Sequence, residues 1–170
     1  ATITGADADE FADWIGRKPI VWDNYPVNDM FPWRPLLAPV KGRSADLGAH
    51  VAGLMANPMK QWYASRLPLA TLAEYLNDPA RYAAEKAQAD AIGEYPPADR
   101  ATLRELMSIY GDAFLGEANY PPKPAPAQLD ACKDLRKKLS TEKSLAGLWQ
   151  DVQPTLDADI AAIEQPAPKQ

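Results

Sequence analysis

The strongest constraint on the fold of this chain lies in residues 19–29, where a short apolar run breaks abruptly into polar residues. The run Ile20-Val-Trp22 is typical of a buried parallel strand. The residues that follow it include Asp23, Asn24, Asn28 and Asp29. In α/β folds, polar side chains gather at the carboxyl ends of parallel strands. We therefore expect a binding site at the end of this strand.

A second apolar run, Val51-Ala-Gly-Leu-Met55, predicts a second strand, and it also ends in a polar break at Asn57-Pro58. A short helix is predicted before each strand. The first is capped by Asp7 or Asp9 and ends at Gly16, and the second is capped by Ser44 together with Asp46 and ends near His50. Two parallel strands cannot bury both faces of a sheet. The missing strands must therefore come from another chain, or this chain is part of a larger α/β domain.

From Pro58 onward the apolar residues recur at helical spacing, so the fold class is expected to be mainly α. Proline-containing breaks at 77–79, 93–97 and 119–126 separate the helices. Pro68 predicts a kink or a helix start, and Pro154 predicts a bend in the last helix. Cys132 and Trp62 are expected in the helical core, because both lie at helical spacing with apolar residues.

Composition excludes several classes of protein. A hydrophobic content of 46% indicates a folded core, and a net charge of -5 provides no basic patch for nucleic acid. No apolar run approaches the ~20 residues of a membrane span. The single cysteine and the single histidine, His50, offer no metal site, and the cysteine leaves the compartment undecided. Ala1 and the linker-like residues 165–170 lead us to expect a piece of something longer.

Three motifs in fixed order resemble glycoside hydrolase family 84, the β-N-acetylglucosaminidases that include O-GlcNAcases and bacterial relatives once called hyaluronidases. They are Trp22-Asp-Asn-Tyr-Pro-Val-Asn-Asp29, Lys41-Gly-Arg-Ser44 and Ala56-Asn-Pro-Met59. The resemblance implies the last two βα units of a (β/α)8 TIM barrel, incomplete in this chain, followed by a helical post-catalytic bundle. It divides the chain into barrel (1–78), helical domain (79–165) and tail (166–170). It also implies a glycan or glycoprotein partner containing N-acetylglucosamine, and a secreted bacterial protein is the favoured setting.

The resemblance also assigns substrate-binding residues. Asp29 would accept hydrogen bonds from the C4 and C6 hydroxyls of N-acetylglucosamine, and Asn57 would contact a neighbouring hydroxyl. Asn24 would lie near the acetamido group, and Trp22 would form part of the pocket around it. A neutral sugar suits such a set, because a carboxylate accepts two bonds and amides both donate and accept. Each residue also has an ordinary structural interpretation, as a turn-former, a helix cap or core filler.

The family's catalytic residues are two consecutive aspartates after strand four, and this chain contains no Asp-Asp pair. We therefore expect no catalytic residue here, and no cofactor or metal. The missing N-terminal barrel segment would provide the pair, from the same or a separate chain. The alternatives are a non-catalytic helical interaction module and a carbohydrate-binding module. The turn Lys41-Gly-Arg-Ser44 lacks the glycine spacing of a phosphate-binding loop and is expected to be structural.

Overall fold

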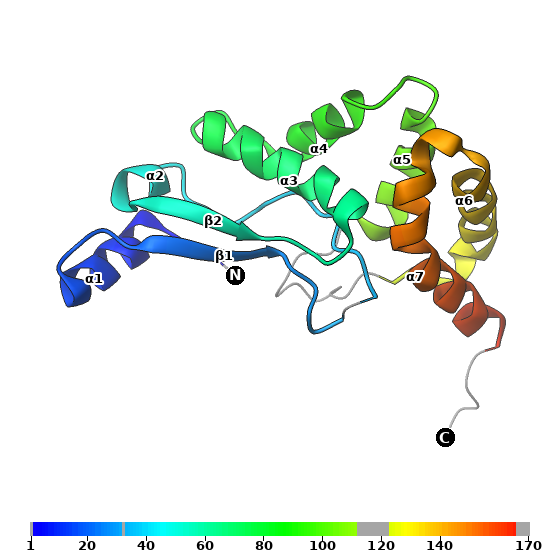
Figure 1. Cartoon of the computed structure of the whole chain (residues 1–170), viewed down its shortest axis with the longest axis horizontal. Helices are drawn as coiled ribbons and strands as arrows, with labels where there is room; N and C mark the ends of the chain where they lie inside the picture. Colours follow the sequence, from blue (N-terminus) through cyan, green and yellow to red (C-terminus); the bar gives the residue numbers. More distant parts are fainter. Residues whose placement is uncertain (1, 32, 112–122, 166–170) are drawn as a thin grey trace.

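The computed structural model describes residues 2–31, 33–111 and 123–165, and within these ranges the chain is mainly helical with two strands (Figure 1). The elements in chain order are α1 (Gly5–Ile15), β1 (Ile20–Pro26), α2 (Leu47–His50), β2 (Gly53–Asn57), α3 (Trp62–Asn77), α4 (Ala84–Gly93), α5 (Arg100–Tyr110), the short 3₁₀ turn η1 (Pro126–Gln128), α6 (Leu129–Thr141), a second 3₁₀ turn η2 (Lys143–Leu145) and α7 (Ala146–Glu164). None of the helices in these ranges is long and apolar enough to cross a membrane.

The start of α1 differs from the sequence prediction. Thr4 is the cap, not Asp7 or Asp9, and its hydroxyl accepts a hydrogen bond from the backbone N of Asp7 at 3.1 Å. The carboxylate of Asp7 accepts from the backbone N of Thr4 at 2.8 Å, which completes a capping box. The predicted end at Gly16 is confirmed, since this glycine has the left-handed conformation (φ 72°) typical of helix C-caps.

The two strands pair in parallel, as predicted, but their bounds and burial differ from the prediction. Ile20 pairs with Gly53 and Trp22 with Met55. Strand β1 continues beyond the apolar run to Pro26, and β2 begins two residues later than expected and includes Asn57. Backbone pairing, rather than the polarity of the side chains, decides where each strand ends.

The apolar run of β1 is not wholly buried as its composition predicted, but the expectation that two strands cannot bury both faces of a sheet is confirmed. Ile20 is 63% exposed and Trp22 is 61% exposed, and their neighbour on β2, Met55, is 47% exposed. The other face carries Asp23 and Tyr25, which are buried against the following loop and α3. Successive side chains of a strand point to opposite faces, so one face is covered by this chain and the other is not.

The main hydrophobic core lies among α3, α5, α6 and α7, at the end of the molecule away from the strands (Figure 1). Its most buried members include Leu67, Leu103, Leu106, Tyr110, Cys132, Leu135, Leu139, Val152 and Leu156. The predicted burial of Cys132 is confirmed. The prediction for Trp62 is wrong, because this side chain at the start of α3 is 67% exposed.

Helix bounds follow the sequence pattern with local shifts. Helix α3 starts at Trp62 instead of Pro58 and contains Pro68 inside it, and α7 contains Pro154. Helix α4 starts at Ala84, later than the proline break at 77–79 suggested. The predicted continuation of α5 to Phe114 and Leu115, and the tail 166–170, lie outside the described residues.

Candidate functional site

Three of the four predicted site residues converge on one oxygen atom. The indole Nε1 of Trp22 donates a hydrogen bond to Oδ1 of Asn24 at 3.1 Å. The side-chain Nδ2 of Asn57 donates to the same oxygen, also at 3.1 Å, from 33 residues away in the sequence. The carboxyl ends of both strands therefore contribute to a single polar cluster, which we call the amide cluster (Trp22, Asn24 and Asn57).

An irregularity in the strand pairing brings the amide cluster together. Asp23 pairs with Ala56, but the next pair is Pro26 with Asn57, so two residues of β1 lie opposite no partner. Such bulges bend a strand and redirect its side chains, and they are common beside active sites. Here the bulge contains Asn24 and Tyr25, and Asn24 is directed toward Asn57 while Tyr25 is buried.

The chemistry of the amide cluster suits a neutral polar ligand. Each carboxamide carries one accepting oxygen and a nitrogen with two donor hydrogens, which is the complement of a hydroxyl or an acetamido group. Trp22 adds an exposed aromatic surface on the same side of the sheet. An apolar wall with a few convergent polar groups is the usual composition of a small-molecule site.

The fourth predicted residue, Asp29, lies in the loop after β1. Its side chain is exposed, and its Oδ1 accepts a hydrogen bond from the backbone N of Met30 at 3.0 Å. Within the described residues, hydrogen bonds connect Trp22, Asn24 and Asn57 to one another, and none connects Asp29 to these three. The structure thus puts Asp29 on the adjoining loop, not within the amide cluster.

The loop that carries Asp29 is fixed from inside by Asn28, whose side chain is only 3% exposed. Nδ2 of Asn28 donates to the backbone O of Arg34 at 2.7 Å and to Oε1 of Gln61 at 3.0 Å. Backbone bonds from Phe31 to Asn28 and from Arg34 to Phe31, both 2.8 Å, close the same loop. This loop, residues 27–37, is called the site loop below.

Sequence reasoning missed a buried ion pair that joins the site loop to α7. Arg34 Nη1 donates to Asp159 Oδ2 at 3.0 Å, and Nη2 donates to Oδ1 at 2.5 Å. Two signals were present in the sequence. Arg34 is a charged residue within an apolar, proline-rich loop, and Asp159 continues the core-facing spacing of Val152 and Leu156. A charge at a core position predicts a buried partner.

The turn Lys41-Gly-Arg-Ser44 has the structural role predicted for it. The guanidinium of Arg43 donates to both carboxylate oxygens of Asp23, with the Nε–Oδ2 bond at 2.8 Å. Both side chains are almost completely buried. Gly42 permits the turn through its positive φ of 73°. The pair occupies the covered face of β1, opposite to the amide cluster.

His50 also has the structural surroundings expected of it. Its Nδ1 lies 2.9 Å from Oδ1 of Asp9, and its Nε2 lies 3.6 Å from Asp46. The contact with Asp9 links α1 to α2, and the contact with Asp46 lies within α2 and its cap. Within residues 2–31, 33–111 and 123–165, no group of three or more His, Cys, Asp or Glu side chains is arranged to hold a metal ion.

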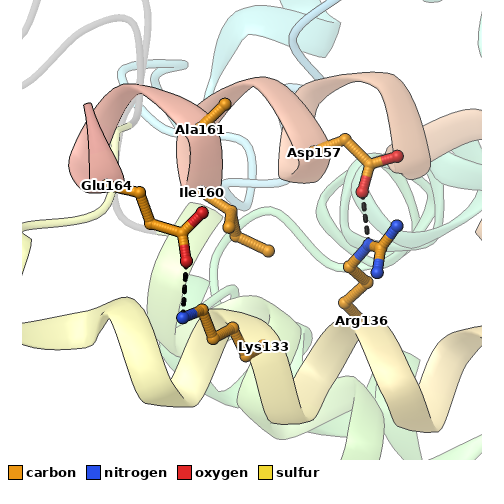
Figure 2. Close-up of a pocket in the computed structure, with 6 residues that line it drawn as sticks. All are labelled: Lys133, Arg136, Asp157, Ile160, Ala161 and Glu164. Carbon is orange, nitrogen blue, oxygen red and sulfur yellow. Dashed lines mark hydrogen bonds and ion pairs between the residues drawn. The ribbon is translucent and has the colours of Figure 1, made fainter. Parts of the chain in front are cut away.

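Two hollows lie away from the amide cluster. One, of about 440 Å³, lies between α6 and α7 (Figure 2) and is lined by Lys133, Arg136, Asp157, Ile160, Ala161 and Glu164. Its charges pair with one another, since Lys133 contacts Glu164 at 2.6 Å and Arg136 contacts Asp157. The other, of about 230 Å³, lies between the Val40–Arg43 turn and the rings of Tyr75 and Tyr82. In neither hollow do the described lining residues include an unpaired charged side chain that could bind a ligand.

Comparison with known proteins identifies the relatives of this chain. A family model described as beta-N-acetylglucosaminidase matches residues 1–108. Protein O-GlcNAcase of Rattus norvegicus is 36% identical over 67 residues, which are 39% of this chain and 7% of the rat protein. The structure of a mutant O-GlcNAc hydrolase of Thermobaculum terrenum aligns with a TM-score of 0.78 and 25% identity, over 96% of this chain and 40% of that chain.

A further solved structure, CpGH84B, aligns with a TM-score of 0.70 over 96% of this chain and 34% of that one, and at 20% identity it shows likeness of fold alone. The chain therefore spans well under two thirds of the length of these relatives. The family match covers more than half of the chain and includes all three sequence motifs. This chain belongs to the β-N-acetylglucosaminidases of glycoside hydrolase family 84.

Proposed function

We propose that this chain is the C-terminal part of a retaining β-N-acetylglucosaminidase and supplies sugar-binding residues to its active site. The observation that carries the proposal is the convergence of Trp22 and Asn57 on Asn24 at the carboxyl ends of two parallel strands. In barrels and other parallel folds this end of the sheet is where ligands bind. The ligand is the terminal β-linked N-acetylglucosamine of a glycan or glycoprotein.

Each of the four residues has a role in this proposal. Asn24 and Asn57 exchange hydrogen bonds with the acetamido group and a ring hydroxyl, and Trp22 forms an apolar wall beside the N-acetyl methyl. Asp29 accepts from two hydroxyls at the far side of the sugar. Its own bond from the backbone of Met30 supports this role, because it fixes the carboxylate in one orientation in the absence of sugar.

The uncovered face of the sheet supports the presence of a larger barrel. Ile20, Trp22 and Met55 form an exposed apolar surface on the paired strands, and Phe11 and Trp14 are separately exposed on α1. A large exposed apolar patch marks an interface. In the proposal, the six preceding strands of a (β/α)8 barrel and their helices, from the same or a separate chain, cover this surface.

The reaction requires residues that this chain lacks. In substrate-assisted hydrolysis the acetamido oxygen attacks the anomeric carbon, and an oxazoline forms as the aglycone leaves. One aspartate orients the acetamido group, and its neighbour protonates the leaving oxygen and then deprotonates the water that opens the oxazoline. No Asp-Asp pair occurs here. We place this pair in the upstream segment, so this chain alone is inactive and its part is to hold the sugar.

Substitution of Asp29 tests the proposal in the full-length protein that carries this chain. Hydrogen bonds to a charged group contribute about 1.5–3 kcal/mol, so Asp29→Ala is expected to weaken N-acetylglucosamine binding by about ten- to a hundredfold. Titration calorimetry with N-acetylglucosamine measures the change, and hydrolysis of a chromogenic β-N-acetylglucosaminide measures its effect on activity.

Asp134→Ala is the matched control, since Asp134 is an exposed aspartate on α6, in the helical part of the chain. It should leave both binding and hydrolysis unchanged. Unaltered sugar affinity in the Asp29 variant would remove this residue from the site. A full-length wild-type protein that neither binds N-acetylglucosamine nor hydrolyses the glycoside would refute the proposed function itself.

A further inference from the structure

Helix α7 presents three polar side chains along one face, at a spacing of four residues. They are Asp151, Thr155 and Asp159, called the α7 stripe below. Residues four apart lie on the same face of a helix, one above the other. All three make hydrogen bonds to segments that follow β1 or β2, at sequence separations of 87 to 125 residues.

Thr155 and Asp159, the two members of the stripe nearer the C-terminus of α7, hold the site loop. Thr155 is fully buried, and its hydroxyl donates to the backbone O of Trp33. Asp159, 5% exposed, makes the two bonds to Arg34 described above. Consecutive residues of the site loop are therefore fixed to the same helix, one by its backbone and one by its side chain. Figure 1 shows the loop leaving the end of β1 and running toward α7.

The remaining member, Asp151, holds the segment after β2. Its Oδ2 accepts a hydrogen bond from the backbone N of Ala64 at 2.9 Å, in the first turn of α3. Helix α3 has no side-chain cap of its own at Gln61. The same helix thus fixes the chain just beyond each of the two strands whose ends carry the amide cluster and Asp29.

The bonds continue from Arg34 to the residue beside Asp29. The backbone O of Arg34 accepts from the buried side chain of Asn28, which directly precedes Asp29. The position of Asp29 therefore depends on Asn28, then on Arg34, and finally on Asp159. At the far end, the Tyr110 hydroxyl donates to Oδ2 of Asp159 at 2.9 Å. Burial, with the neighbouring carboxylate of Asp159, raises the pKa of Tyr110, so the phenol stays protonated as a donor.

We propose that the α7 stripe positions the sugar-binding loops, with Asp159 acting through Arg34 and Asn28 to fix Asp29 in its binding position. Asp159 is a positioning residue and does not touch the sugar. The inference rests on the proposed function, because it takes Asp29 to be a sugar ligand. In this inference the helical part of the chain contributes to substrate affinity through the position of Asp29, in addition to packing in the core.

The competing explanation is that the ion pair between Arg34 and Asp159 has only a structural role. Replacing the pair with apolar residues distinguishes this explanation from the proposal. A buried ion pair can often be replaced by apolar residues of similar size without loss of stability. The apolar pair cannot reproduce the planar, two-bond geometry by which a guanidinium fixes its carboxylate. Because Tyr110 also donates to Asp159, the apolar replacement includes Tyr110→Phe, so that no buried hydroxyl is left without an acceptor. If the pair is only structural, Arg34→Met combined with Asp159→Leu and Tyr110→Phe should restore a normal protein. If it positions the loop, stability returns but sugar affinity does not.

The experiment uses three variants of the full-length protein: Asp159→Asn, the triple variant that combines Arg34→Met, Asp159→Leu and Tyr110→Phe, and the control Asp157→Asn. Asp157 lies on the same helix and pairs with Arg136 at the more exposed surface shown in Figure 2. Three quantities are measured: the dissociation constant for N-acetylglucosamine, the melting temperature, and the hydrogen-exchange rate of the Phe31 amide. That amide donates to the backbone O of Asn28 and so reports on the site loop.

We expect Asp159→Asn to weaken N-acetylglucosamine binding by about ten- to a hundredfold, the usual cost of disturbing a residue that orients a binding group. Exchange of the Phe31 amide should accelerate in parallel. The triple variant should melt close to wild type yet keep the weakened binding and the fast exchange. Asp157→Asn should match wild type in all three measurements.

Two results would overturn the inference. One is wild-type sugar affinity in the triple variant, and the other is unchanged Phe31 exchange in a folded variant whose affinity has fallen. If Asp159→Asn fails to fold, the triple variant decides by the same criteria. A wild-type protein that binds no N-acetylglucosamine would refute the proposed function, whereas the exchange rates would still show whether Asp159 holds the site loop.

Discussion

Three consecutive residues of β1 have opposite surroundings. Asp23 and Tyr25 are 1% and 3% exposed, whereas Asn24 between them is exposed and bonded to Asn57. The two buried side chains fix the strand to the rest of the chain. Asp23 forms an ion pair with Arg43, and the Tyr25 hydroxyl donates a hydrogen bond to the backbone O of Pro68 in α3. The position of Asn24 in the candidate site therefore depends on its two neighbours.

Tyr25 allows a test of this dependence. Its hydroxyl contacts the backbone O of Ala38 at 2.9 Å, the backbone O of Pro68 at 3.1 Å and the hydroxyl of Thr71 at 3.1 Å, all in the interior. Tyr25→Phe leaves buried acceptors without this donor, so we expect a loss of about 1–3 kcal/mol in the free energy of unfolding. Urea unfolding followed by circular dichroism measures it.

Tyr63→Phe provides the comparison, because the Tyr63 side chain is 44% exposed. It should change the unfolding free energy by less than about 0.5 kcal/mol, as is usual for surface substitutions. Equal effects of the two substitutions would show that the hydroxyl of Tyr25 does not hold β1 to α3.

At the scale of elements, helix α3 depends on a cap from another helix. Four backbone N–H groups at the start of any helix lack an internal partner. Here the carboxylate of Asp151 on α7 accepts from one of them, at Ala64. A negative charge at this end also interacts favourably with the helix dipole. Two helices far apart in the sequence are thus joined at the end that follows β2.

Asp151→Ala should lower the free energy of unfolding by about 1 kcal/mol, the typical cost of losing a helix cap. Asp151→Asn should recover most of this loss, because its side-chain oxygen still accepts the bond. Exchange of the Ala64 amide gives a local readout and should accelerate only in the alanine variant. Similar stability of the alanine variant and wild type would contradict the capping role.

At the scale of the whole molecule, buried tyrosines set a limit on stability at high pH. Burial raises the pKa of Tyr25, Tyr82 and Tyr110, and that of Tyr82 rises to about 12. An exposed tyrosine in the unfolded chain loses its proton near pH ~10. Above that pH the unfolded chain binds fewer protons than the folded one, so stability must fall as pH rises.

We expect the free energy of unfolding to be insensitive to these tyrosines below pH ~9 and to decrease steadily above pH ~10. Urea unfolding at a series of alkaline pH values gives the slope. Tyr82→Phe should reduce that slope between pH ~10 and the pKa of about 12 in the folded protein. An identical slope in the variant would show that Tyr82 does not contribute to it.

Local patterns in the sequence were sufficient for the mainly helical class, for two parallel strands and for the position of Asn24 and Asn57 at the strand ends, whereas the choice of Trp22 came from the motif resemblance. These features follow from periodicity and from the rule that parallel strands present their carboxyl ends at one edge. The motif resemblance gave the family, which the comparisons established. It also gave Asp29 its proposed role, which remains a prediction.

The tertiary structure alone decided the features that depend on distant partners. The presence of only two strands predicted that one face of the sheet would stay uncovered. Which residues of β1 lie on that face could not be predicted, because an apolar strand looks the same whether its covering layer is present or absent. The bulge at Asn24 follows from how β1 pairs with β2, and the pairing of Arg34 with Asp159 joins residues 125 positions apart. The sequence by itself determined that Asn24 and Asn57 lie at the strand ends, since that depends on local periodicity. The tertiary structure determined what holds them there, because long-range contacts arise only when distant segments pack together.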